Sequence, residues 1–277
     1  KQNKIIRKFF KRYIFIKNNQ YYRNILNKIK YNKYDYFLFI KGNNIPNFFF
    51  EELLKNNKKI RVISYQWDDI ENCIEILEKR KFIDKFYTYS KYDAEKYTMD
   101  YMPMFLLPDN EKTFFNKKYD ILNVITLHKS RIEIVNNLNS KKELIIKNHI
   151  ILDSIKAYCL YLKLKKKYFK IKKVKLKYKE YLKLIDESKA ILDLPINNQK
   201  GLTTRVMEAL SRGTKVITFN QEIKKYSFYN EEYILLLSEI ELEKIKKFIS
   251  KESENMKYVK EYLKNYYIEN WINKILK

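Results

Sequence analysis

The sequence predicts an α/β fold with doubly wound parallel sheets, arranged in two domains. Short apolar runs alternate with helix-like stretches along residues 36–99, which is the pattern of strand–helix–strand units. The alternation stops near Pro108 and restarts at residues 119–126. The chain has 277 residues, 45% of them hydrophobic, so it is long and apolar enough for two globular domains. We therefore expect one domain over residues 1–113 and a second over residues 114–277.

Each element of the first domain follows from a local signal. Strands are expected at residues 36–40, 60–65 and 85–89, where apolar and aromatic residues cluster. Helices are expected at residues 1–33, 48–56, 69–79 and 91–99, and Ser90 can cap the last of them. In the second domain, strands are expected at residues 119–126 and 190–194 and from Lys215, and residues 242–276 have helical apolar spacing.

Glycine is scarce, and two of the three glycines, Gly201 and Gly213, fall within residues 199–220. Such a chain is expected to keep glycine where φ is positive or where backbone approaches a ligand closely. Here a glycine loop follows a buried strand, Thr203 or Thr204 can cap the next helix, and Gly213 can end that helix in the left-handed conformation. The amide donors and dipole of a helix that starts after such a loop favour a phosphate-like anion.

Two charged residues make this segment a candidate binding site. Arg205 falls in the first helical turn and Glu208 lies three residues later, so both side chains can face the same opening. A guanidinium can bind a diphosphate, and a carboxylate can accept hydrogen bonds from a ribose diol. The residues alone also allow a simpler interpretation, in which the two side chains form an ion pair and Gly201, Thr203 and Thr204 only build the turn.

The segment resembles the donor-binding segment of GT-B fold glycosyltransferases. More narrowly, it is similar to a bacterial group of lipopolysaccharide or capsular polysaccharide biosynthesis with the pattern Gln-x-Gly-Leu-Thr-x-Arg-x-x-Glu-Ala-Leu. The matching residues are Gln199, Gly201, Leu202, Thr203, Arg205, Glu208, Ala209 and Leu210. Weaker matches occur in order at residues 35–42, 65–68, 93–97, 102–103, 126–131 and 217–230, so the resemblance covers nearly the whole chain.

The resemblance implies two Rossmann-like domains, the first without its opening strand or two, because the chain opens on a basic helix-like stretch. It implies transfer of a sugar from a nucleotide-sugar donor to a glycan or lipid-linked glycan of the cell surface, with no metal or other cofactor. The protein would be cytoplasmic, or peripheral at the inner face of the cytoplasmic membrane. Gly201, Thr203, Thr204, Arg205 and Arg131 would contact the donor phosphates, and Glu208 would bind its ribose.

Two residues are candidates for acid–base chemistry at the acceptor. Asp68 follows Trp67 at the end of a first-domain strand, where a carboxylate can serve as general base for the acceptor hydroxyl. Its alternative role is a cap for the helix expected from Asp69. His128, which follows a predicted strand, is the second candidate, although a lone histidine is more often structural.

Two departures from the family pattern leave other outcomes open. Lys200 stands where many retaining enzymes have a second glutamate, and Ile125 stands where the group has a glycine. The stereochemistry of transfer is therefore undecided, and a catalytically inactive relative of the same fold is an alternative.

The charge balance gives a further alternative. The net charge is +25, with ten lysines in residues 163–179, which suits an anionic membrane surface or, less well, a nucleic acid. Only 8 of the 58 basic residues are arginines, so a lysine-rich solvated surface explains much of the charge. Cys73 and Cys159 have no metal-ligand spacing and are expected to be buried apolar residues. No apolar run reaches the roughly 18 to 20 residues that span a bilayer.

Overall fold

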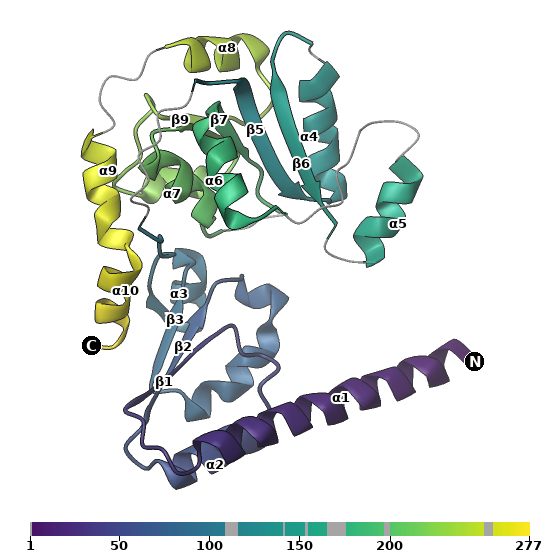
Figure 1. Ribbon diagram of the computed structural model, residues 1–277, viewed down its shortest axis with the longest axis vertical. Coiled ribbons are helices and arrows are strands. Elements are labelled where there is room, and N and C mark those ends of the chain that lie inside the picture. Colours follow the sequence, from purple (N-terminus) through teal and green to yellow (C-terminus); the bar gives the residue numbers. More distant parts are fainter. Residues whose placement is uncertain are drawn as a thin grey trace. The chain divides into compact units, whose positions relative to one another are not determined.

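The computed structural model describes residues 2–108, 116–140, 142–152, 155–164, 176–196, 200–251 and 257–277. The chain divides into two compact units (Figure 1). Unit 1 comprises Lys1–Pro103 and Ile275–Lys277, and unit 2 comprises Met104–Lys274. Each unit contains one parallel sheet with helices, which confirms the α/β fold class. The domain boundary expected at residue 113 lies outside the described residues and stays a prediction.

Unit 1 is built on a sheet of four parallel strands in the order β1-β2-β3-β4. The strands are β1 (Tyr36–Ile40), β2 (Arg61–Gln66), β3 (Lys85–Thr88) and β4 (Asp100–Tyr101). The helices are α1 (Gln2–Ile29), α2 (Asn47–Asn56) and α3 (Lys91–Tyr97), together with the 3₁₀ helices η1 (Ile70–Asn72) and η2 (Ile74–Phe82). The three predicted strands and the helices α1, α2 and α3 are confirmed, with small shifts at their ends.

The helix expected at residues 69–79 is present as two 3₁₀ helices and not as one α-helix. The buried residues are Ile70, Cys73, Ile76 and Lys79, which recur every third position. A 3₁₀ helix has three residues per turn and places all four on one face, whereas an α-helix has 3.6. The core of unit 1 therefore selects the tighter helix.

Capping explains the start and end of α3. The Ser90 hydroxyl accepts a hydrogen bond from the Asp93 amide at 3.2 Å, which confirms the predicted cap. The helix ends at Tyr97, before the expected residue 99, because Thr98 has a left-handed φ of 53°.

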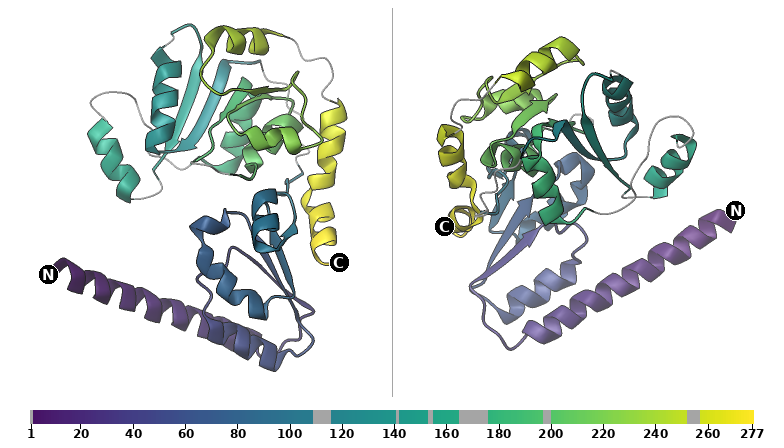
Figure 2. Two further views of the ribbon diagram at one scale, coloured as in Figure 1. Left: turned by 180° about the vertical axis from the view of Figure 1, so that it is seen from behind. Right: turned by 45° about the horizontal axis from the view of Figure 1, so that its top comes forward.

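The carboxyl-terminal half of α1 packs against α2. The Tyr22 and Phe49 rings are 5.3 Å apart, the Arg23 guanidinium lies 4.7 Å from the centre of the Phe48 ring, and Leu26 is buried. The amino-terminal half of α1 extends beyond α2 (Figure 2). Tertiary packing against α2 therefore supports the second half of this helix.

Unit 2 has a five-stranded parallel sheet in the order β6-β5-β7-β8-β9. The strands are β5 (Tyr119–Thr126), β6 (Ile146–Ile151), β7 (Ser188–Asp193), β8 (Lys215–Thr218) and β9 (Ile234–Leu236). The helices are α4 (Lys129–Ser140), α5 (Ile155–Leu164), α6 (Tyr178–Asp186), α7 (Thr204–Ser211), α8 (Leu242–Ser250), α9 (Lys257–Leu263) and α10 (Ile268–Ile275), with 3₁₀ helices η3 (Gln221–Lys225) and η4 (Lys264–Tyr266). The chain runs from β5 outward to β6, then back past β5 to β7. Because such connections are right-handed, this reversal puts α4 on one face of the sheet and α6 and α7 on the other, so the sheet is doubly wound.

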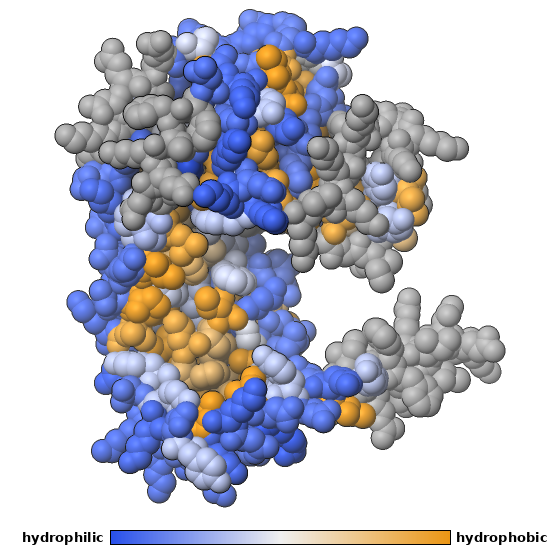
Figure 3. Space-filling model, in the orientation of Figure 1, coloured by the Kyte–Doolittle hydropathy of each residue, from blue (hydrophilic) through white to orange (hydrophobic). Residues whose placement is uncertain are grey.

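The surface matches the lysine-rich composition, since hydrophilic residues cover much of the face shown in Figure 3. Cys73 is buried as expected, but Cys159 is exposed, so the prediction of a buried residue there is wrong. Cys159 lies on α5 two residues after the core residue Ala157, which is about 200° around the helix, so it faces solvent. Most of the lysine tract, residues 165–175, lies outside the described residues. Within the described part of the chain, no helix is long and apolar enough to cross a membrane.

Candidate functional site

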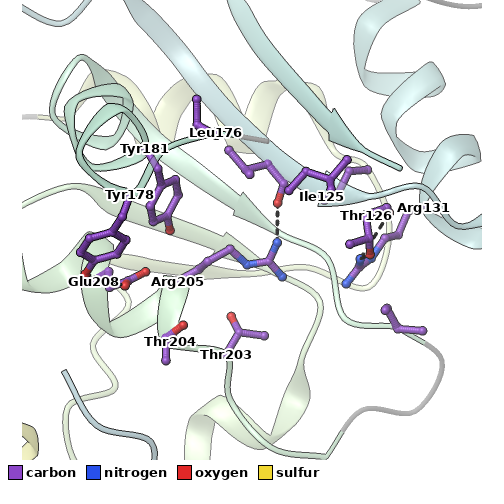
Figure 4. Close-up of a pocket in the computed structure, with 13 residues that line it drawn as sticks. Ile125, Thr126, Arg131, Leu176, Tyr178, Tyr181, Thr203, Thr204, Arg205 and Glu208 are labelled. Atoms are coloured by element: carbon purple, nitrogen blue, oxygen red, sulfur yellow. Dashed lines mark hydrogen bonds between the residues drawn. The ribbon is translucent and has the colours of Figure 1, made fainter. Parts of the chain in front are cut away.

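A cavity of about 490 Å³ opens in unit 2 at the carboxyl ends of β5 and β7. These two strands flank the point where the order of the sheet reverses, and open α/β sheets bind ligands there. Five residues of the predicted donor site line the cavity, namely Arg131, Thr203, Thr204, Arg205 and Glu208 (Figure 4). They come from α4 and from the start of α7, so the fold brings together residues far apart in sequence.

The cavity exists because β5 and β7 separate. Their pairing ends at Leu122 and Ile191, whereas β5 stays paired with β6 as far as Thr126 and Ile151. Among the described residues, β5 makes no further ladder pairing with β7 beyond Leu122. The Val124 carbonyl on this stretch accepts a hydrogen bond from Arg205 Nη1. The guanidinium thus takes the place of a strand partner.

Arg205 is held at the wall of the cavity by a second contact. Its Nη2 lies 3.5 Å from Asp193 Oδ1, and its side chain is 21% exposed. A guanidinium has five N–H donors, so these two contacts leave donors that can reach a ligand. The ion pair with Glu208, which the sequence allowed, is not formed between these two described residues, because Arg205 pairs with Asp193 instead.

Glu208 faces the same cavity and accepts a hydrogen bond from a residue of α6. The Tyr178 hydroxyl donates to Glu208 Oε1 at 3.0 Å (Figure 4). Burial raises the pKa of the Glu208 carboxyl, and the Tyr178 and Tyr181 hydroxyls and the Arg205 charge act in the opposite direction. The same burial, together with the Glu208 charge, raises the pKa of Tyr178. The site therefore couples one carboxyl group to two phenols.

The turn before α7 differs in one respect from the prediction. Thr203 occupies the N-cap position, but its side chain makes no cap hydrogen bond. Its hydroxyl donates to Asp193 Oδ1 at 3.0 Å, below the start of the helix. The prediction that a threonine hydroxyl caps α7 is thus wrong for Thr203.

The two glycines of this segment have different roles. Gly213 has a φ of 81° and ends α7 as predicted, with its amide bonded to Leu210 O at 3.1 Å and the Thr214 amide to Ala209 O at 2.8 Å. Gly201 is buried, and its carbonyl accepts a hydrogen bond from Asn220 Nδ2 at 3.1 Å. Gly201 is not among the residues that line the cavity in the described part of the chain, so its contact with a ligand stays a prediction.

Arg131 and His128 are three positions apart in sequence but are placed differently. Arg131 is only 3% exposed, lines the cavity, and donates from Nη1 to Thr126 Oγ1 at 2.8 Å. His128 Nδ1 is 2.8 Å from Ser130 Oγ, and His128 is absent from the described lining. Ile125 lines the cavity, yet its side chain is 1% exposed and packs in the core of unit 2. The Ile125 side chain is therefore accommodated in the core of unit 2.

Asp68 belongs to unit 1, where it follows β2. Its carboxylate pairs with the Lys41 ammonium, and both side chains are about 40% exposed, at 41% and 44%. Lys41 has a left-handed φ of 70°, and its carbonyl accepts from Gln66 Nε2 at 2.9 Å. The alternative role of Asp68 as a helix cap is wrong, because Asp69 holds the N-cap position of η1.

Sequence reasoning missed two parts of the site. Asp193 is 1% exposed and ends β7, and the sequence offered one signal for it, a carboxylate inside an otherwise apolar run. Tyr178 and Tyr181 are spaced three apart on α6 and line the cavity beside Glu208, to which Tyr178 donates, but nothing in their own segment points to α7. These contacts depend on the packing of α6 beside α7.

No family model matches the chain, and no curated protein matches it either. Solved structures do resemble it, at low identity. The sucrose-phosphate synthase of Thermosynechococcus elongatus has a TM-score of 0.64 and 11% identity, over 95% of this chain and 76% of that one. The catalytic domain of Arabidopsis thaliana starch synthase IV, bound to ADP and acarbose, has a TM-score of 0.60 and 11% identity, over 95% and 78%. The amino-terminal domain of Candida albicans trehalose-6-phosphate phosphatase has a TM-score of 0.60 and 12% identity, over 94% and 74%.

These likenesses define the fold class. The chain has the GT-B fold, in which two Rossmann-like α/β domains are joined, and the predicted fold class is confirmed. At 11 to 12% identity the likeness extends to the fold and no further.

Proposed function

We propose that the protein is a glycosyltransferase that binds a nucleotide-sugar in the cavity of unit 2. It would transfer the sugar to a glycan or lipid-linked glycan of the bacterial cell surface, of the lipopolysaccharide or capsule type. One observation carries the proposal: Arg205 and Glu208, both on α7, face one cavity at the reversal point of the sheet. The starch synthase of the same fold was solved with ADP, a nucleoside diphosphate, bound.

The cation and the helix end form the phosphate part of the proposed site. When the sugar leaves, negative charge develops on the nucleoside diphosphate, and a preorganised guanidinium offsets it. Arg205 is already oriented by Val124 and Asp193, so little reorganisation is needed. The first amides of α7, beside Thr203 and Thr204, add donors and the positive end of the helix dipole.

Glu208 forms the ribose part of the proposed site. One of its oxygens accepts from Tyr178, and the other can accept from a ribose hydroxyl. The ring of Tyr178, 45% exposed, stands beside this position. Arg131 is the second cation of the cavity and is proposed to support the phosphates.

The acceptor part of the mechanism rests on Asp68 as proposed general base, which would take the proton of the acceptor hydroxyl. Its ion pair with Lys41 must then open or shift to admit the acceptor. His128 is the second proposed base. Lys200, where a retaining pair would need a carboxylate, keeps the stereochemistry open.

Thermal unfolding in the presence of ligands tests the proposal. UDP, GDP, ADP, CDP and their sugar conjugates are each added at a large excess, beside short RNA and vesicles with anionic lipid. A ligand at about 100 times its Kd stabilises the folded state by about 2.7 kcal/mol, which is a shift of several degrees in Tm. Stabilisation by one nucleotide is expected, and it should be clearly smaller in Arg205→Ala but unchanged in Arg61→Ala, an exposed arginine of unit 1.

The other outcomes identify the alternatives. Stabilisation by RNA or vesicles alone would make the chain a basic binding module and refute the proposal. Nucleotide binding without sugar transfer or donor hydrolysis would identify an inactive relative of the fold. Vesicle binding that weakens with salt would add a membrane contact to the proposed function.

A further inference from the structure

Asp193 is an almost fully buried carboxylate beside the cavity, and the proposed function gives it no contact with the donor. It is 1% exposed and does not line the cavity. Burying a carboxylate is costly unless hydrogen bonds compensate it. Its position at the carboxyl end of β7, opposite Thr218 of β8, puts it beneath the start of α7.

Three donors meet this carboxylate, two from the start of α7 and one from β8. Thr203 Oγ1 donates to Oδ1 at 3.0 Å, and Thr218 Oγ1 donates to Oδ2 at 3.0 Å. Arg205 Nη2 lies 3.5 Å from Oδ1. Two of these partners, Thr203 and Arg205, line the cavity, whereas Thr218 does not. The carboxylate therefore connects the strand β8 to two cavity residues at the start of α7.

The separation of β5 from β7 makes this connection necessary. Arg205 reaches across the gap to Val124 O, and that single contact leaves the guanidinium free to rotate about the bond. The contact with Asp193 fixes the second nitrogen, and so the plane of the guanidinium. A bidentate grip on a diphosphate depends on that plane.

We infer that Asp193 is a positioning residue for the donor phosphates: it orients Arg205 and holds Thr203, without touching the ligand. The inference rests on the proposed function, because it names the residue that prepares the proposed phosphate site. It predicts that the effect of Asp193 on ligand affinity is transmitted through Arg205.

A double-mutant cycle tests this role. The variants are Asp193→Asn, Arg205→Ala and both together, and the Kd values for UDP, GDP, ADP, CDP and inorganic pyrophosphate are measured by calorimetry. The control is Asp186→Asn, since Asp186 is a similarly buried carboxylate that accepts from Arg212 Nε at 2.6 Å outside the cavity. Urea unfolding of each variant reports stability separately.

Asp193→Asn is expected to raise the Kd of the tightest-binding nucleotide and of pyrophosphate by about tenfold. In the Arg205→Ala background the same change should cost less than about twofold, because the residue through which it acts is gone. Asp186→Asn should lower stability and leave both Kd values in place.

Three results would overturn the inference. An unchanged Kd in Asp193→Asn, or an equal loss in both backgrounds, shows that Asp193 does not act through Arg205 while the proposed function stands. Wild-type protein that binds none of the probes refutes the proposed function, and the positioning role with it. If Asp193→Asn does not fold, Thr218→Val removes one donor from the carboxylate and keeps the shape, and an unchanged Kd in that variant counts against the inference.

Discussion

Glu208→Gln should separate stability from binding in the donor site. Burial raises the pKa of this carboxyl above its ordinary value of 4.5. Between the ordinary value and the raised one, the folded protein holds the proton more tightly than the unfolded chain does. The contribution of Glu208 to the free energy of unfolding therefore falls as the pH rises through that window, and above it the folded state carries the full cost of a buried charge.

The glutamine amide is neutral at every pH and keeps an oxygen that can accept from Tyr178. We therefore expect Glu208→Gln to be at least as stable as wild type at pH 8 and to lose any advantage at pH 4. Urea unfolding at the two pH values measures this. Lower stability of the variant at pH 8 would contradict the assigned burial cost.

Binding should change in the opposite direction. Tyr178 occupies one carboxylate oxygen, so the structure leaves one oxygen for a ribose hydroxyl. A hydrogen bond to a charged acceptor contributes about 1 kcal/mol more than a neutral one, so the Kd of a nucleoside diphosphate should rise about fivefold. Inorganic pyrophosphate has no ribose, and its Kd should stay the same. Calorimetry measures both Kd values, and an equal rise of the two would refute a ribose role for Glu208.

Four further changes have definite expected outcomes. Arg205→Ala should raise the Kd of a nucleoside diphosphate roughly ten- to a hundredfold, which is the range for losing a hydrogen bond to a charged group. If calorimetry shows an unchanged Kd in a folded variant, Arg205 is not part of the site. Asp68→Asn should reduce turnover by roughly 100- to 10,000-fold with donor affinity unchanged, and near-normal transfer in a donor-consumption assay would direct attention to His128. Gly42→Ala should cost about 2 to 4 kcal/mol in urea unfolding, because Gly42 has a φ of 68° and the new Cβ would lie 2.2 Å from Phe39 Cδ2. Gly213→Ala, at a φ of 81°, should cost about 1 to 2 kcal/mol, and a larger loss there than at Gly42 would contradict the assigned clash.

Local signals were enough to predict most secondary structure. The strands β1 and β5 begin and end at the expected residues, and Ser90 caps α3 as predicted. The reason is physical: apolar runs, caps and left-handed glycines act over a few residues. The 3₁₀ segment was missed because its period of three, from Ile70 to Lys79, becomes visible only when the buried face is known.

The sequence by itself predicted the α/β fold from its strand–helix alternation, and its resemblance to GT-B glycosyltransferases implied the GT-B fold. It also placed Arg205 and Glu208 on one short helix, because the two residues lie close together in the chain. Only the tertiary structure decided what surrounds them. Arg205 meets a carbonyl 81 positions away, and Glu208 meets a tyrosine 30 positions away. Asp193 contacts both β8 and the start of α7, next to the point where the pairing of β5 with β7 ends and the strand order reverses. Such contacts depend on strand order and helix packing, which no local pattern of residues encodes.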